Sequence, residues 1–103
     1  MRIALYCKES LFGEGLASLL NRRGGFQVVA SETNARGLVT SAKDEDAQLL
    51  VVDSHELDRD ELQFLLGAKA FGNFAIVLIA SDGDMESLAG ASVDGLVSRR
   101  DCA

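Results

Sequence analysis

The chain has 103 residues with 10 basic and 16 acidic side chains, which gives a formal net charge of −6 at pH 7. This length fits one domain, and the acidic balance argues against direct nucleic-acid binding by that domain. The longest apolar run, Phe74 to Ala80, is much shorter than the roughly 20 residues that cross a bilayer, and the apolar start after Arg2 is too short for a signal peptide. We therefore expect a cytoplasmic protein without membrane contact.

The two cysteines, Cys7 and Cys102, stand near opposite ends of the chain. They form no CxxC motif and no metal-ligand spacing, so we expect reduced thiols, no metal site and no cofactor. A buried, inert Cys7 is favoured over a redox sensor activated by the adjacent Lys8, because free cysteine is among the most often buried residue types.

Strand-like and helix-like segments alternate from the N-terminus. A strand is predicted over Ile3 to Tyr6, followed by a helix that Ser10 caps and that Gly24-Gly25 ends. A second strand is predicted over Phe26 to Ala30. The first helix has its apolar face at Leu11, Phe12, Leu16, Leu19 and Leu20, and a second, short helix has its face at Ala35, Leu38, Val39 and Ala42.

The alternation continues through the second half of the chain. Leu49 to Val52 is a continuous apolar run, as expected for a strand that is covered on both faces in a parallel sheet. Asp58 and Glu61 are spaced like a capping box and predict the start of a helix with Leu62, Leu65 and Leu66 facing inward. The remaining segments are a strand over Phe74 to Ala80, a helix over Asp82 to Ala89 and a strand over Gly95 to Val97.

This pattern of about five strands and four helices indicates an α/β fold, with right-handed crossovers and a doubly wound parallel sheet in the order 2-1-3-4-5. The chain reaches Ala103 soon after the fifth strand, so we expect the fifth helix of such a fold to be missing from it. One apolar face of the sheet is then either exposed or covered by a partner or by a continuation of the protein.

Asp53 follows the apolar run Leu49 to Val52, and strand ends of this kind are where open α/β sheets bind their ligands. In the order 2-1-3-4-5, the carboxyl ends of the first and third strands meet at the point where the strand order reverses. We therefore expect one crevice there. Its members are Asp53, Cys7, Lys8 and Glu9, with Ile79, Ser81 and Arg99 nearby.

Four segments of the sequence resemble the receiver domain of response regulators. They are Leu11 to Leu16 (LFGEGL), Val51 to Asp53 (VVD), Asp60, and Val93 to Val97 (VDGLV). Their order and spacing resemble most closely the receivers that precede LuxR/NarL-type DNA-binding domains. The resemblance covers essentially the whole chain, residues 1–103, and implies a CheY-like fold.

The resemblance also implies which residues replace the parts of a phosphorylation site. Receivers hold a magnesium ion with two acids after the first strand and with the phosphoacceptor, whose equivalent here is Asp53. Cys7 and Lys8 match the acid pair, Ile79 matches the switch threonine or serine, and Arg99 matches the lysine after the fifth strand. We therefore expect a degenerate receiver that binds no metal. In it, Lys8 pairs with Asp53, and phosphotransfer is slow or absent.

The leading functional prediction is a regulatory and dimerisation module without enzyme activity, at the front of a longer transcriptional regulator whose DNA-binding domain is covalently attached. Its expected homodimer interface consists of Met85, Leu88, Leu96 and Val97. One alternative is a conventional receiver that accepts phosphate on Asp53 from a sensor kinase, with Glu9 as a substitute metal ligand. Another is a flavodoxin-like module that binds an anionic small molecule against Lys8 and Arg99.

Overall fold

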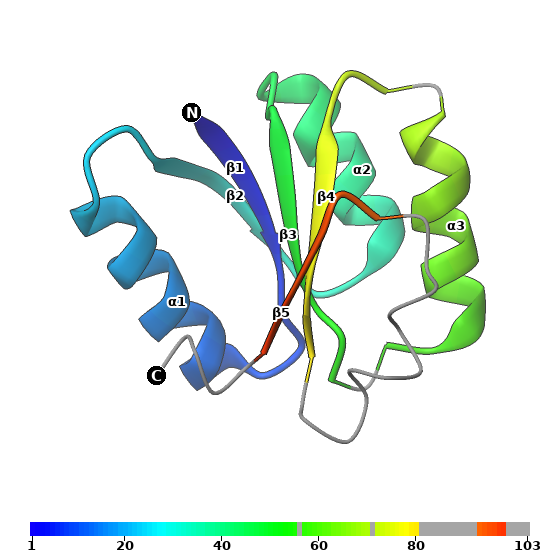
Figure 1. The fold of residues 1–103 in the computed structure, drawn as a ribbon, viewed down its shortest axis with the longest axis horizontal. Helices are drawn as coiled ribbons and strands as arrows, with labels where there is room; N and C mark the ends of the chain where they lie inside the picture. Colours follow the sequence, from blue (N-terminus) through cyan, green and yellow to red (C-terminus); the bar gives the residue numbers. More distant parts are fainter. Residues whose placement is uncertain (56, 71, 81–92, 99–103) are drawn as a thin grey trace.

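The computed structural model describes residues 1–55, 57–70, 72–80 and 93–98, and it confirms the predicted α/β architecture (Figure 1). A parallel five-stranded sheet has the order β2-β1-β3-β4-β5. Its strands are β1 (Arg2–Tyr6), β2 (Gln27–Glu32), β3 (Leu49–Asp53), β4 (Ala75–Ala80) and β5 (Gly95–Ser98). The described helices are α1 (Ser10–Arg22), α2 (Ala35–Asp44) and α3 (Arg59–Lys69). None of these helices is long and apolar enough to span a membrane.

All five predicted strands and the first three predicted helices are present. The fourth helix, expected over Asp82 to Ala89 with Met85 and Leu88 on its inner side, lies outside the described residues. β5 ends at Ser98, the last described residue, so the expected absence of a fifth helix stays a prediction.

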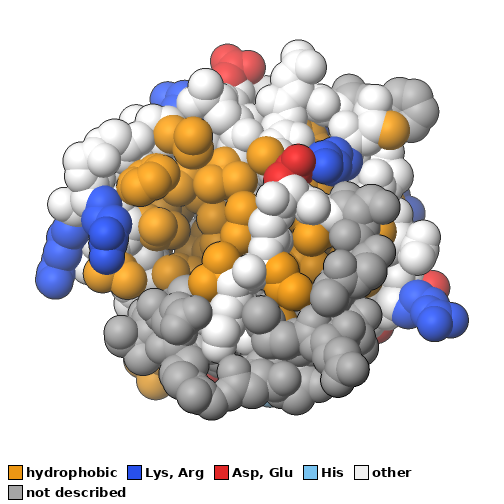
Figure 2. Space-filling view, in the orientation of Figure 1, with side chains coloured by type: hydrophobic (Ala, Val, Ile, Leu, Met, Phe, Trp, Pro, Cys, Tyr) orange, Lys and Arg blue, Asp and Glu red, His pale blue; other side chains and the backbone are white. Residues whose placement is uncertain are grey.

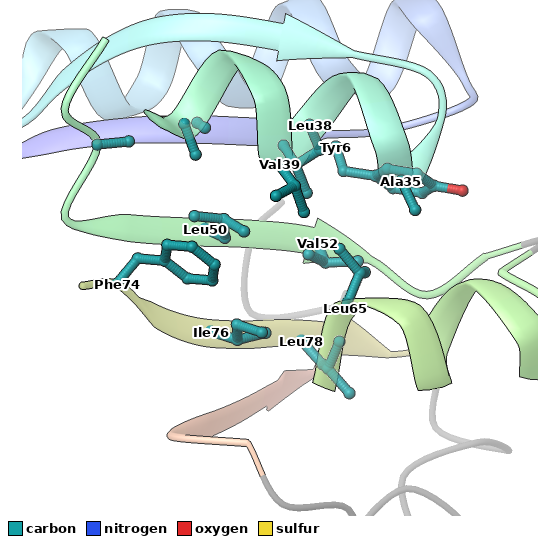
Figure 3. Packing of buried hydrophobic residues seen from close by; sticks show 13 residues of the cluster. Tyr6, Ala35, Leu38, Val39, Leu50, Val52, Leu65, Phe74, Ile76 and Leu78 are labelled. Carbon is teal, nitrogen blue, oxygen red and sulfur yellow. The ribbon is translucent and has the colours of Figure 1, made fainter. Parts of the chain in front are cut away.

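The sheet is covered by helices on both faces, with α1 on one face and α2 and α3 on the other (Figure 1). Because side chains alternate between the two faces of a strand, the residues of β3 divide between the two layers. Leu50 and Val52 are fully buried on the side of α2 and α3 (Figure 3). Each such side chain stabilises the fold by about 1.5–3 kcal/mol. The main members of this core are Tyr6, Leu38, Leu50, Val52, Leu65, Ile76 and Leu78.

The opposite face has a smaller core beneath α1, which packs against β1 and β2. Its buried members are Ile3, Leu5, Leu16, Val51 and Ile79. The smaller size of this cluster follows from its single described helix, whereas two described helices cover the other face.

The predicted N-terminal cap is correct for α3 and wrong for α1. Asp58 Oδ1 accepts a hydrogen bond of 2.7 Å from the Glu61 backbone N–H, so the predicted cap of α3 is confirmed. Ser10 is not the cap of α1, because it is already helical and Glu9 holds the cap position. The first helical hydrogen bond, from the Gly13 N–H to the Glu9 carbonyl, measures 2.9 Å, and Glu9 makes no side-chain cap bond.

Asp58→Ala should lower the free energy of unfolding by about 1 kcal/mol, because it leaves a backbone N–H of the first turn of α3 without its acceptor. Urea unfolding followed by circular dichroism measures this change. Asp60→Ala is the matched control, since it removes an equal charge from the same turn while the Asp58 cap stays in place. Equal losses in the two variants would mean that charge alone, and not the cap, stabilises the start of α3.

Candidate functional site

Asp53 and Cys7 meet at the carboxyl ends of β3 and β1, on the α1 side of the sheet. Asp53 is only 1% exposed and Cys7 only 4% exposed, so the predicted burial of Cys7 is confirmed. The Cys7 thiol lies 3.4 Å from Asp53 Oδ2 and 3.1 Å from the Glu9 carbonyl oxygen. The strand ends therefore place a neutral thiol against the carboxylate at the position where the receiver resemblance implies a second acid.

The other oxygen of Asp53 is bound by the backbone of the following loop. The His55 N–H donates to Asp53 Oδ1 at 3.2 Å, while the Ser54 N–H donates to the Ile79 carbonyl at 2.8 Å. Asp53 and Ile79 are also register partners between β3 and β4. A buried carboxylate needs donors of this kind, because an uncompensated charge in the interior is very unfavourable. Asp53 thus has structural partners on both of its oxygens.

Lys8 lies against Glu61 of α3. The Lys8 Nζ is 2.8 Å from Glu61 Oε1, and the Tyr6 hydroxyl donates to Glu61 Oε2 at 2.7 Å. The predicted pairing of Lys8 with Asp53 stays a prediction. Alternation along the chain directs residues 6 and 8 to the α3 side and residue 7 to the α1 side, which agrees with the ion pair between Lys8 and Glu61.

The contacts among Lys8, Glu61 and Tyr6 shift the pKa values of Glu61 and Tyr6. Burial raises the pKa of Glu61, but the hydrogen bonds from Lys8 and Tyr6 and the positive charge of Lys8 outweigh it, so the pKa lies below the ordinary value of 4.5. A contact with the Asp58 backbone lowers the pKa further, as the predicted capping box requires. Burial raises the pKa of Tyr6 well above its usual range, and the negative charge of Glu61 adds to this. At neutral pH the three side chains therefore form an ammonium, a carboxylate and a neutral phenol.

The other predicted site residues divide between described and undescribed parts of the chain. Glu9 is exposed at the start of α1, and Ile79 is buried beside Asp53. Leu96 is half-buried and packs against the core beneath α2 and α3, while Val97 is half-buried and register-paired with Ile79. Four further predicted residues lie outside the described residues: Ser81, Met85, Leu88 and Arg99.

Sequence reasoning missed the roles of Tyr6 and Glu61. Glu61 was recognised only as part of a capping box, and Tyr6 only as the end of a strand. The signal that points to them is the alternation itself, because a phenol and an ammonium two residues apart at a strand end can reach the same acid on one neighbouring helix.

The site does not fit a magnesium ion. Mg²⁺ prefers several hard oxygen ligands, and the position beside Asp53 holds a thiol while the next residue carries an ammonium group. Among the residues that the structure describes, no group of three or more His, Cys, Asp or Glu side chains is arranged to hold a metal.

A hollow of about 310 Å³ adjoins Glu61, between the first turns of α2 and α3. Three acids line it, and the Arg36 guanidinium covers the Phe64 ring with a separation of 5.0 Å from the ring centre. The acids lie at or near the N-terminal end of α3, where negative charge stabilises the helix dipole. This concentration of negative charge makes the hollow unsuitable for an anionic ligand. The three acids are Asp58, Asp60 and Glu61.

Comparison with solved structures identifies the fold. The chain superposes on a pilus assembly protein, CpaE, from Burkholderia thailandensis with a TM-score of 0.81 and 19% identity, over 97% of this chain and 86% of that one. It superposes on the signal receiver domain of the response regulator NarL from Mycobacterium tuberculosis with a TM-score of 0.77 and 16% identity, over 94% and 82%. RcsB from Salmonella enterica serovar Typhimurium, bound to promoter rprA with the phosphomimetic BeF3-, matches with a TM-score of 0.77 and 13% identity, over 97% and 87%.

No family model and no curated protein sequence matches the chain. At these low identities the structural likeness establishes the fold, which is the CheY-like receiver fold that the sequence predicted.

The Glu61 cluster predicts an acid-sensitive contribution to stability. Because the pKa of Glu61 is depressed in the folded state, its contribution is fully present above the unfolded-state pKa and is lost as pH falls through the folded-state pKa. Glu61→Gln should therefore be less stable than the wild type at neutral pH and should lose less of its stability on acidification. Urea unfolding at several pH values between about 7 and about 3 measures this difference.

Glu14→Gln, at an exposed position on α1, is the matched control for this pH series. It removes one carboxylate without touching the cluster. Parallel pH profiles for wild type and Glu61→Gln would contradict the role given to Lys8 and Tyr6.

Proposed function

We propose that the chain is a pseudo-receiver: a regulatory module of two-component type in which phosphorylation of Asp53 is lost or weak. The observation that supports this proposal best is the position of the Cys7 thiol. It lies 3.4 Å from Asp53 Oδ2, where the receiver resemblance implies a metal-binding acid. Phosphoryl transfer to a carboxylate brings negative charges together and needs a cation at the reacting oxygens. With a thiol in the place of an acid, the described residues supply no ligand set that would hold such a cation.

The burial of Asp53 supports the same proposal. Its carboxylate is 1% exposed, and both oxygens lie within hydrogen-bond distance of Cys7 or His55. An attacking Oδ would have to leave these donors and reach a phosphoryl donor in solvent. Asp53 thus has a structural role, in which its contact with Cys7 joins the ends of β3 and β1.

The Lys8–Glu61–Tyr6 cluster then supplies the fixed geometry of the module. In a phosphorylated receiver, metal and phosphate transiently hold the loops at the strand ends in one arrangement. Here the ion pair and the phenol hydrogen bond join the end of β1 to the start of α3 without metal or phosphate. The module acts through the contacts that this geometry presents, and it catalyses no reaction.

The setting that we propose is a longer cytoplasmic transcriptional regulator, with residues 1–103 as its N-terminal part, a covalently attached DNA-binding domain and a homodimeric state. RcsB is a regulator seen bound to a promoter, and NarL is a response regulator. The acidic charge of this chain supports a DNA contact made by another domain rather than by these residues. Leu96 and Val97, with Met85 and Leu88, are the interface that the receiver resemblance suggests.

A second setting is a receiver-like module within an assembly protein. It is suggested by the likeness to the pilus assembly protein CpaE, whose TM-score of 0.81 exceeds those of NarL and RcsB. Fold alone does not fix function, and the two settings share the same inactive site. They differ in the domain attached to the module.

The direct test of the inactive site is a two-dimensional amide NMR titration with beryllium fluoride and magnesium, on wild type and on Asp53→Asn. We expect an unchanged spectrum in both proteins, because the site lacks the ligands that hold the metal and the phosphate analogue. Saturable shifts around Asp53 that vanish in Asp53→Asn would contradict the proposal and would establish a phosphorylatable receiver. Shifts caused by other anions around Lys8 would instead favour an anionic-ligand module.

A rebuilt site provides the complementary gain-of-function test. Cys7→Asp/Lys8→Asp should unfold at a lower temperature than wild type without metal, because a second carboxylate then lies beside the buried Asp53 and Glu61 loses its ion pair with Lys8. Millimolar-range magnesium should raise its melting temperature but leave that of wild type unchanged. Cys7→Asn/Lys8→Asn, which has the same size and no added charge, is the control. A wild-type protein that magnesium stabilises would overturn the assignment of Cys7 and Lys8.

A further inference from the structure

The hollow of about 310 Å³ between the first turns of α2 and α3, here called the α2–α3 hollow, has side chains of both charges on its walls. It contrasts with the face in Figure 2, where hydrophobic side chains gather between α1 and β5 and charged side chains lie mostly toward the rim. Because α2 follows β2 and α3 follows β3, the hollow lies at the carboxyl ends of the strands, where open α/β sheets bind their ligands. Its volume is at the lower end of the range of about 300–1,000 Å³ for small-molecule sites.

The α2 wall of the hollow carries hydrogen-bond donors. Arg36 stacks its guanidinium on the Phe64 ring, which leaves the N–H groups at the edge of the guanidinium for other contacts. Although three acids line the same hollow, Arg36 forms no ion pair with any residue that the structure describes. The backbone N–H groups of Ala35 and Arg36 also lack helical acceptors, because they belong to the first turn of α2. This wall therefore offers several donors to one carboxylate.

The α3 wall of the hollow carries hydrogen-bond acceptors. Glu61 is already neutralised, because its Oε1 lies 2.8 Å from the Lys8 ammonium group. Asp58 uses Oδ1 for the cap of α3, and its second oxygen is not needed for that cap. Asp60 forms no ion pair within the part of the chain that the structure describes. The two aspartates are therefore the negative groups of the hollow that remain for a ligand.

We propose that the α2–α3 hollow binds a free α-amino acid. The carboxylate of the ligand binds to Arg36 and to the N–H groups at the start of α2, and its ammonium group binds to Asp58 and Asp60 on α3. A simple anion would be repelled by the two aspartates, and a simple amine would be repelled by the guanidinium. A zwitterion of this size neutralises both walls at once, so the charges of the hollow select it over either single ion.

The hollow is connected to the end of β1 through Glu61. This residue lines the hollow and also holds Lys8 and Tyr6, so a bound amino acid lies beside the Lys8–Glu61–Tyr6 cluster. In the proposed pseudo-receiver, the ligand replaces phosphate as the signal that fixes the start of α3. This regulatory meaning rests on the proposed function, whereas the binding itself rests on the charges and the size of the hollow.

Two-dimensional amide NMR titrations with each of the twenty standard amino acids, without magnesium or phosphate analogues, test this inference. We expect saturable shifts at the first turns of α2 and α3 for at least one of them, with a dissociation constant between about 10 μM and about 1 mM. The amine that lacks the carboxylate of this ligand, and the carboxylic acid that lacks its ammonium group, should each bind at least about tenfold more weakly.

Two outcomes of these titrations would overturn the inference. One is the absence of shifts with all twenty amino acids. The other is an amine or a carboxylic acid that binds as tightly as the amino acid, because the hollow would then be a site for a single ion.

Arg36→Gln and Asp60→Asn remove the two opposite charges in turn. Each should raise the dissociation constant about tenfold or more, and both positions are exposed, so circular dichroism should show an intact fold. Lys43→Gln, in the last turn of α2, is the matched control and should leave the dissociation constant unchanged. Binding that survives both hollow variants would place the ligand elsewhere and overturn the inference. None of these measurements uses magnesium, beryllium fluoride or Asp53, so the two proposals fail separately.

Discussion

The alternation of side chains at the carboxyl end of β1 is the constraint on which the site depends. Consecutive residues of an extended strand must point to opposite faces, so Tyr6 and Lys8 meet Glu61 of α3 while Cys7 meets Asp53 of β3. Three neighbouring residues thereby join the strand end to a second strand and to a helix. The thiol is neutral and the ammonium group is already paired, so neither resembles the acid pair of a metal-dependent receiver.

The same alternation governs the two faces of the sheet. On the side of α2 and α3, side chains such as Leu50 and Leu78 are completely buried. On the side of α1, Val77 and Val97 are half-buried, whereas Val51 and Ile79 are buried in the cluster that contains Leu16 of α1. The site and the two cores of the sheet therefore have one origin in strand geometry.

The fold could be predicted from the sequence, because the spacing of apolar residues in each segment shows whether it is a strand or a helix and which side of it is buried. It also placed Asp53 and Cys7 together, since both follow strands that are adjacent in the predicted order. The ion pair of Lys8 with Glu61 was not predicted, because the sequence does not show that the first turn of α3 lies beside the end of β1. The cap of α1 was misplaced by one residue, since a serine before an apolar run does not reveal whether its backbone is already helical.

The central proposal is that Asp53 does not accept a phosphoryl group. Incubation of the purified protein with acetyl phosphate and magnesium, followed by intact-mass spectrometry at once and after alkaline hydroxylamine, measures this directly. We predict no phosphorylated species, because Asp53 is buried against a thiol and lacks the ligands that would hold the metal. A hydroxylamine-labile phosphoryl adduct that forms on wild type and not on Asp53→Asn would contradict the account.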